Sequence, residues 1–233
     1  MTHIQKTALL IGNSDGIGLR TTHFLLAQNY KIIGLSKNNV HIDNLNYRHF
    51  IQDITHEKYQ SALQDILSSM PNLDLCIYFA GIGTSIDLDK LEQETKVFQV
   101  NLMSAVITTE AILTKMLKNN HGHFIGLSSV MDVMIVPEAP SYSASKSGIS
   151  KYWEGLALAL KKSEVKVSNI RFGFVDTKMA DAPYKPFLMT TQQAAEFIYS
   201  IIKRPRPRAT KPLVMGLICW FYSLRIRLKL LLK

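Results

Sequence analysis

The chain has 233 residues, of which 47% are hydrophobic and 19% are charged, and this composition excludes a disordered protein. The net charge of +9 suggests a nucleic-acid-binding protein at first sight, but nine of the 27 Lys and Arg residues lie from Lys203 onward, where no Asp or Glu occurs. Residues 1–202 therefore hold 18 basic and 18 acidic residues, so we expect a neutral body, a basic tail and no nucleic-acid partner.

The cysteines and the N-terminal residues bear on the cellular compartment. Cys76 and Cys219 form neither a disulfide framework nor a metal-binding spacing, which suits a reducing compartment, and we predict no metal site. The first apolar run, residues 7–11, is too short for the apolar region of a signal peptide. We therefore expect a cytoplasmic protein, either free or peripheral at the inner membrane face.

A glycine-rich turn follows the first predicted strand, residues 7–11, and precedes residues 19–29, which have helical character. Glycines allow a tight turn and close approach to a ligand, and the N-terminus of a helix offers free N–H groups to a diphosphate. The sequence thus predicts a dinucleotide-binding turn, with a plain tight turn as the alternative. The turn residues that we assign to the cofactor are Gly12, Ser14, Asp15, Gly16, Ile17 and Gly18.

The end of the second predicted strand, residues 31–35, bears on which dinucleotide binds. An acidic residue there would accept hydrogen bonds from the adenosine ribose of NAD(H), whereas a cation would pair with the 2′-phosphate of NADP(H). The strand continues into Ser36 and Lys37 with no acid, so we favour NADP(H) over NAD(H). The alternative is that Lys37 is only a solvated loop residue.

Six β-prone runs alternate with helical segments along the chain, which predicts an α/β fold: a Rossmann-like, doubly wound, mainly parallel sheet with helices on both faces. The other predicted strands are residues 47–52, 73–79, 122–127 and 165–172; the predicted helices are residues 57–69, 91–119 with a bend near Asn101, a helix capped by Ser141 and running to Leu160, and 190–203. We therefore predict one domain, residues 1–203, followed by a basic and apolar extension, residues 204–233.

Ligands of such sheets bind beyond the carboxyl ends of the strands, and the candidate residues of this chain all fall there. In addition to the glycine turn, Ser36 and Lys37, these ends present Asp53, Ile54, Ala80, Gly81, Ser129, Gly173, Val175 and Thr177. Apart from Ser129, we assign these residues to cofactor binding. Their common location predicts a single site.

Tyr142 and Lys146 lie one helical turn apart, so the ammonium can approach the phenol and favour its ionised form. Tyr199 and Lys203 have the same spacing, but thirteen residues before Tyr142 stands the strand-end Ser129, whereas no serine holds the equivalent place before Tyr199. Asn101 is a poor helix former in an apolar context, so we expect its amide to bind a backbone carbonyl or to hold a water molecule.

With these motifs the chain resembles the short-chain dehydrogenase/reductase family over roughly residues 6–203. Gly12, Gly16, Ile17 and Gly18 match the cofactor turn of that family, Asp53 and Ile54 its adenine-side motif, and Asn101, Ser129, Tyr142 and Lys146 its catalytic residues. The resemblance implies an oxidoreductase that transfers hydride between a nicotinamide and a small-molecule carbonyl or secondary alcohol, with Tyr142 as acid and base. Tyr142 and Lys146 would also touch the cofactor. A homo-oligomer is expected.

Some positions depart from the pattern of the family. Ile11 stands where a Thr is usual, Tyr78 and Phe79 stand where two Asn are usual, and Phe172 replaces a Pro. Asp15 occupies a place where many NADP(H)-dependent members have a cation, which weighs against the cofactor assignment. None of these departures touches the four catalytic positions, but a non-catalytic dinucleotide sensor and a membrane-associated scaffold remain alternatives.

The C-terminal extension has two interpretations. Residues 212–224 are almost all apolar but too few to span a bilayer, and residues 225–230 alternate like a strand, although Arg225, Lys229 and Lys233 would also share one helix face. Residues 209–233 could contact an anionic membrane surface. Alternatively, they pack on a second subunit or fold back over the substrate site.

Overall fold

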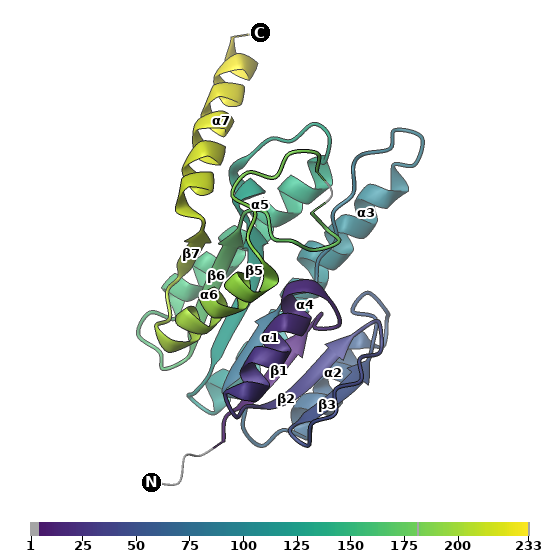
Figure 1. The fold of residues 1–233 in the computed structure, drawn as a ribbon, viewed down its shortest axis with the longest axis vertical. Coiled ribbons are helices and arrows are strands. Elements are labelled where there is room, and N and C mark those ends of the chain that lie inside the picture. Colours follow the sequence, from purple (N-terminus) through teal and green to yellow (C-terminus); the bar gives the residue numbers. More distant parts are fainter. Residues whose placement is uncertain (1–4, 181, 233) are drawn as a thin grey trace.

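A seven-stranded parallel sheet forms the centre of the computed structural model, which describes residues 5–180 and 182–232 (Figure 1). Its order is β3-β2-β1-β4-β5-β6-β7, and all six pairings are parallel. The strands are β1 (Thr7–Ile11), β2 (Lys31–Ser36), β3 (Tyr47–Ile51), β4 (Leu75–Tyr78), β5 (His123–Ser129), β6 (Lys166–Phe172) and β7 (Arg208–Lys211). The six predicted strands and the doubly wound fold are confirmed.

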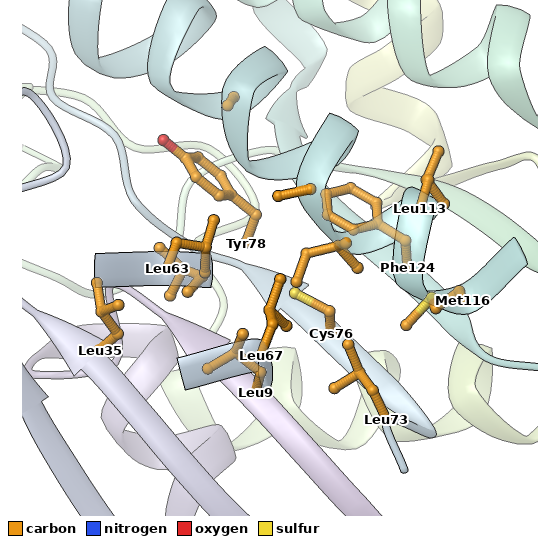
Figure 2. Close-up of a cluster of buried hydrophobic side chains, with 14 of the residues drawn as sticks. Leu9, Leu35, Leu63, Leu67, Leu73, Cys76, Tyr78, Leu113, Met116 and Phe124 are labelled. Atoms are coloured by element: carbon orange, nitrogen blue, oxygen red, sulfur yellow. The ribbon is translucent and has the colours of Figure 1, made fainter. Parts of the chain in front are cut away.

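Helices cover both faces of the sheet. On one face lie α1 (Gly16–Ala27) and α6 (Thr191–Lys203), and on the other lie α2 (Tyr59–Ser68), α4 (Ser104–Lys118) and α5 (Pro140–Ala159). Figure 2 shows the second of these layers, where Leu9 and Cys76 of the sheet meet Leu63 and Met116 of the helices. Because both faces are covered, β1, β2 and β5 are buried along nearly their whole length, and buried and exposed residues do not alternate.

One long helical stretch contains the predicted bend at Asn101. It consists of α3 (Glu92–Phe98), a π-helical turn η1 (Gln99–Met103) and α4. Wide turns of this kind are frequently found at functional sites. Of the described chain, only the span Glu92–Lys118 is long and apolar enough to cross a membrane, and more than half of its most apolar window is buried inside the protein, as expected of a core helix.

The start of α5 differs from the prediction. Pro140 occupies the first turn, and Ala139 rather than Ser141 stands at the N-cap position. Proline fits there because its fixed φ is helical and its missing N–H would have no partner in the helix. The backbone N–H of Ser141 instead donates to Glu94 Oε2 at 3.2 Å, which ties α5 to α3.

The C-terminal part contains a strand that we did not predict. β7 pairs with β6, so the sheet extends to Lys211, within the segment that we assigned to the C-terminal extension. β7 is followed by the helix α7 (Leu213–Leu231), whose first half packs on the 3-10 turn η2 (Val130–Val133), which follows β5. Figure 1 shows the second half of α7 projecting past the other elements. Residues 225–230 are therefore helical and not a strand; Lys233 lies outside the described residues.

Candidate active site

Ser129 is placed by two elements at once. It is the last residue of β5 and the N-cap of η2, where its Oγ accepts a hydrogen bond from the backbone N–H of Met131 at 3.2 Å. Strand pairing with β6 on one side and this cap on the other hold its side chain at the carboxyl edge of the sheet. Its hydroxyl is near enough to the Tyr142 phenol to favour the ionised form of that phenol.

Tyr142 and Lys146 extend from the first turns of α5 toward this edge. Burial raises the pKa of the Tyr142 phenol, and the hydrogen bond with Ser129 opposes this only in part. The predicted lowering by Lys146 is therefore wrong for this structure, in which the ammonium lies 5.9 Å from the centre of the Tyr142 ring. A phenol that keeps its proton is suited to donate it to a substrate oxygen.

Lys146 is buried, with 6% of its surface exposed. Its ammonium donates to the carbonyl oxygen of Leu127 at 3.2 Å, and burial lowers its pKa to about 8. The backbone of Gly81 passes so close that an added Cβ would lie 3.2 Å from Lys146 Nζ. The predicted residues Gly81 and Lys146 are thus brought together.

Asn101 belongs to the π-helical turn, and its amide binds the backbone of the loop after β4. Its Nδ2 donates to the carbonyl of Ile82 and its Oδ1 accepts from the N–H of Ile82, both at 2.8 Å, while Nδ2 also donates to Ser145 Oγ at 3.1 Å. Of the two predicted roles, the bond to a backbone carbonyl is the one observed. Asn101 therefore joins the loop after β4 to α5 beside Lys146.

The glycine turn has the geometry that a dinucleotide requires. Gly12 and Gly16 adopt positive φ values of 81° and 51°, and a Cβ at Gly12 would lie 2.7 Å from the backbone nitrogen of Ala80. A Cβ at Gly18 would lie 2.6 Å from the carbonyl oxygen of Gly12. Ser14 is half-buried and Asp15 is exposed at the N-terminus of α1, where free N–H groups can bind a diphosphate, while Ile17 packs against the core below the turn.

Asp15 caps α1 and also holds the segment after β6. Its Oδ1 accepts from the N–H of Gly16 at 2.7 Å, and its Oδ2 lies 2.8 Å from Lys178 Nζ. These contacts, led by the Lys178 hydrogen bond, lower the pKa of the Asp15 carboxyl. Thr177 packs on Gly16, so the end of β6 and the glycine turn meet.

The remaining candidates, two after β6 and one after β3, make structural contacts. Gly173 donates its N–H to the carbonyl of Lys211 at 2.9 Å, and Val175 is buried and bridges to Met189. Ile54 accepts a hydrogen bond from Ser104 at its carbonyl. These three residues therefore shape the edge through their backbone and packing.

At the adenosine end, Lys37 and Asp53 form an ion pair of 3.3 Å across the ends of β2 and β3. The Asp53 carboxylate also accepts from the backbone and hydroxyl of Thr55, and these contacts lower its pKa. Lys37 nevertheless keeps 72% of its side chain exposed, so its ammonium can still meet a ligand.

A partly buried hydrogen-bonded chain behind this end was not predicted. Asn13 donates to the Tyr47 hydroxyl at 2.9 Å, which donates to His49 Nδ1 at 2.8 Å, while His49 Nε2 donates to the carbonyl of Asn38 at 3.0 Å. A carbonyl can only accept, which fixes the histidine tautomer. The chain links the glycine turn to the loop that holds Ser36, whose hydroxyl also meets His49 Nε2 at 3.2 Å. No sequence spacing signals it, because Asn13 lies in the glycine turn and Asn38 in the loop after β2, whereas Tyr47 and His49 lie on β3.

Tyr78 departs from the sequence pattern of the family, yet it supports the site. Its hydroxyl donates to the carbonyl of Val100, next to Asn101, at 3.0 Å, so it braces β4 against the π-helical turn. The part of the chain that the structure describes holds no group of three or more His, Cys, Asp or Glu residues that could bind a metal ion.

Comparison with known proteins agrees with this geometry. The family model of short chain dehydrogenases matches residues 6–185. An uncharacterized oxidoreductase of Staphylococcus saprophyticus is 26% identical over 188 residues, covering 75% of this chain and 80% of that protein. The 3-ketodihydrosphingosine reductase of Bacteroides thetaiotaomicron is 30% identical over 177 residues, covering 74% of this chain and 65% of that protein.

A solved structure shares the fold closely. A short chain dehydrogenase of Burkholderia cenocepacia in complex with NADP superposes with a TM-score of 0.81 at 19% identity, over 96% of this chain and 99% of that one. The family match spans most of the chain, so the protein belongs to the short-chain dehydrogenase family. It is an oxidoreductase that acts on CH–OH or C=O groups with a nicotinamide dinucleotide, and the sensor and scaffold alternatives are not favoured.

Proposed function

We propose that this oxidoreductase reduces a ketone that carries an apolar chain, uses NADP(H), and delivers the proton from Tyr142. The approach of the Ser129 hydroxyl to the Tyr142 phenol, beside the buried ammonium of Lys146, carries the proposal. The nicotinamide supplies the hydride when bound. The protein supplies the proton, the orientation of the carbonyl and the exclusion of water.

Each side chain has a role that follows from its contacts. Ser129 and Tyr142 both direct hydroxyl groups at one place, so a carbonyl oxygen there accepts two hydrogen bonds that strengthen as its negative charge grows. The proton then passes from the Tyr142 phenol to that oxygen. Lys146 keeps a positive charge beside the resulting phenolate, and Asn101 positions the loop after β4 against α5.

The preference for NADP(H) rests on the end of β2. The strand ends at Ser36 and is followed by the exposed cation Lys37, and no carboxylate replaces it at the place where NAD(H)-dependent enzymes bind the ribose. The Burkholderia neighbour was crystallised with NADP, which agrees with this choice. We expect Lys37→Ala to weaken NADPH binding about tenfold or more and to leave NADH binding nearly unchanged.

An apolar substrate is favoured by two observations. The curated relative from Bacteroides is named for a long-chain ketone, 3-ketodihydrosphingosine. In this chain, the segment after β6 exposes Met179, Tyr184, Phe187 and Leu188, and it is held at the site by the Lys178 to Asp15 contact. These side chains offer an apolar path for an alkyl chain whose carbonyl lies at Tyr142.

We also place the enzyme in the cytoplasm as a homo-oligomer. Cys76 and Cys219 are both free and buried, which suits a reducing compartment. Leu158 is 67% exposed on α5, and such a side chain on an otherwise amphipathic helix suits contact with a second copy. Sedimentation velocity of the pure protein tests this, and a monomer at micromolar concentration would contradict it.

The test of the reaction is Tyr142→Phe, with Tyr199→Phe as the matched control. Tyr199 also precedes a lysine by four residues, but its hydroxyl only binds Gln28 on the surface. On a panel of short and long-chain ketones, NADPH oxidation should fall at least 100-fold in the Tyr142 variant and stay unchanged in the control. Retained turnover in the Tyr142 variant would refute the proposed acid. NADPH binding without turnover of any ketone by the wild type would instead favour a sensor.

A further inference from the structure

The last helix, α7, packs on the protein along only one narrow face, which we call the buried face. Met215, Cys219 and Ser223 recur every fourth residue and are buried, the first two against Val130 of η2. The Ser223 hydroxyl donates to the carbonyl of Val133. Most of the remaining helix surface is exposed, and beyond Ser223 α7 projects past the other elements (Figure 1).

A second face of α7, turned away from the buried face, forms an apolar stripe along the whole length of the helix. Leu213, Leu217, Trp220, Leu224, Leu228 and Leu231 follow one another at intervals of three or four residues, and each is exposed by 44% or more. With 100° per residue, they fall within one sector of the helix, centred about 140° from Cys219. A continuous apolar stripe of this length is costly in water and indicates a partner surface.

The charges beside the stripe identify that surface. Arg225 and Lys229 flank it on one side and Arg227 on the other, and α7 contains no acidic residue. Cations on both flanks of an apolar face, with Trp220 and Phe221 in contact at 4.9 Å, are typical of helices that lie in the headgroup region of an anionic bilayer. α7 is not among the helices apolar enough to cross a membrane, which agrees with a helix lying in the plane.

A second copy of α7 fits the pattern less well. Supercoiled helices pair through positions that repeat every 3.5 residues, and such a repeat from Leu217 through Trp220 and Leu224 places Arg227 in the seam. The same cations would also meet one another across some of these pairings. A straight stripe with a period near 3.6 suits a flat surface instead.

We infer that α7 is an interfacial helix that docks the enzyme on an anionic lipid bilayer. At 19 residues it is about 28 Å long and lies in the plane of the membrane, with its apolar stripe toward the acyl chains and Arg225, Arg227 and Lys229 at the phosphates. Because α7 is fastened to η2, which follows Ser129 directly, docking holds the carboxyl edge of the sheet next to the lipid. This inference does not depend on the substrate or on turnover.

Substitutions test the inference better than truncation, because removing residues 209–233 would also remove most of β7. Leu217→Asp with Leu228→Asp breaks the apolar stripe at two positions where more than half of the side chain is exposed. Leu45→Asp with Leu88→Asp makes the same chemical change at exposed leucines far from α7 along the chain and is the matched control. NADPH binding by each variant confirms that the fold is intact.

Flotation with vesicles of phosphatidylcholine, with and without 30% phosphatidylglycerol, measures the docking. We expect the wild type and the control to float with the anionic vesicles, and the stripe variant to remain in the soluble fraction. Replacing Arg225, Arg227 and Lys229 by Gln should lower binding to anionic vesicles about 100-fold. A wild type that fails to float, or a stripe variant that floats like the wild type, would overturn the inference.

Tryptophan fluorescence gives an independent readout, since Trp153 is buried in the core and Trp220 is half exposed on the stripe. Anionic vesicles should shift the emission to shorter wavelength in the wild type, and Trp220→Phe should abolish the shift. If vesicles change nothing while the stripe variant changes the sedimentation coefficient from that of a larger assembly to that of a smaller one, the stripe binds a second copy and the membrane inference is wrong.

Discussion

Lys146→Met should make the protein more stable while removing its activity. Burial lowers the pKa of the Lys146 ammonium from 10.5 to about 8, and each unit of pKa corresponds to about 1.4 kcal/mol. Keeping the charged form inside the fold at pH 7 therefore costs about 3 kcal/mol. The methionine fills a similar volume but loses the hydrogen bond to the carbonyl of Leu127, which is worth about 1 kcal/mol. We expect a net gain of about 2 kcal/mol in the free energy of unfolding.

The pH dependence of this gain has a defined sign. The folded pKa of Lys146 lies below its unfolded value, so the destabilisation is complete below pH 8 and fades as the pH rises from about 8 to 10.5, where both states become neutral. The difference between Lys146→Met and wild type is thus largest at pH 7 and small at pH 10.5. The titration of other groups affects both proteins equally, so it cancels in the difference between their free energies of unfolding.

Urea denaturation of the cofactor-free protein at pH 7 and at pH 10 measures both quantities. Lys151→Met, five residues further along α5, is the control, because Lys151 is exposed and its removal should change the stability by less than about 0.5 kcal/mol. If Lys146→Met is no more stable than wild type at pH 7, or if its advantage persists undiminished at pH 10, burial of this ammonium does not carry the cost that we assign to it.

Three further substitutions test other parts of the site. Asp132→Asn leaves the buried guanidinium of Arg171 without its carboxylate and should lower the free energy of unfolding by about 3–5 kcal/mol, whereas replacing both residues by Leu and Met should cost much less in urea denaturation. Gly34→Ala inserts a Cβ 2.6 Å from the Tyr47 hydroxyl and should cost about 1–3 kcal/mol, while Gly155→Ala, with nothing within 4 Å, should stabilise α5 by up to about 1 kcal/mol in the same assay. Asp15→Asn keeps a capping oxygen but removes a negative charge beside the diphosphate site, so fluorescence titration should show NADPH binding several-fold tighter; weaker binding would show that the Lys178 contact matters more.

Strand and turn prediction succeeded where the local sequence determines the outcome. The run ending at Ile11 is apolar because both faces of the sheet are covered. Gly12 and Gly16 adopt positive φ angles, which residues with a Cβ rarely adopt. Such features depend on a few consecutive residues. The gathering of candidates at one edge then follows from the parallel sheet itself, whatever the packing details are.

Prediction was wrong or incomplete where the local structure depends on contacts between segments that are distant in the sequence. β7 has only four residues and follows two prolines, so its strand state depends on pairing with β6. Residues 225–230 fit both a strand and a helix by their spacing, and the packing of Met215 and Cys219 on η2 selects the helix. The pKa of Tyr142 depends on burial, which the Tyr-to-Lys spacing does not reveal.

The burial of Lys146 also distinguishes an enzyme from a scaffold on physical grounds. Among residues 5–180 and 182–232, no carboxylate pairs with its ammonium, which is held by one backbone carbonyl although it is almost fully buried. The buried Arg171, by contrast, has a full carboxylate partner in Asp132 and serves the structure. A buried cation without a carboxylate partner lowers the stability of the fold. Its position beside Tyr142 and Gly81 is therefore explained by function: the ammonium binds a ligand there or stabilises a negative charge that develops during the reaction. A scaffold held at a membrane by α7 would have no need of it.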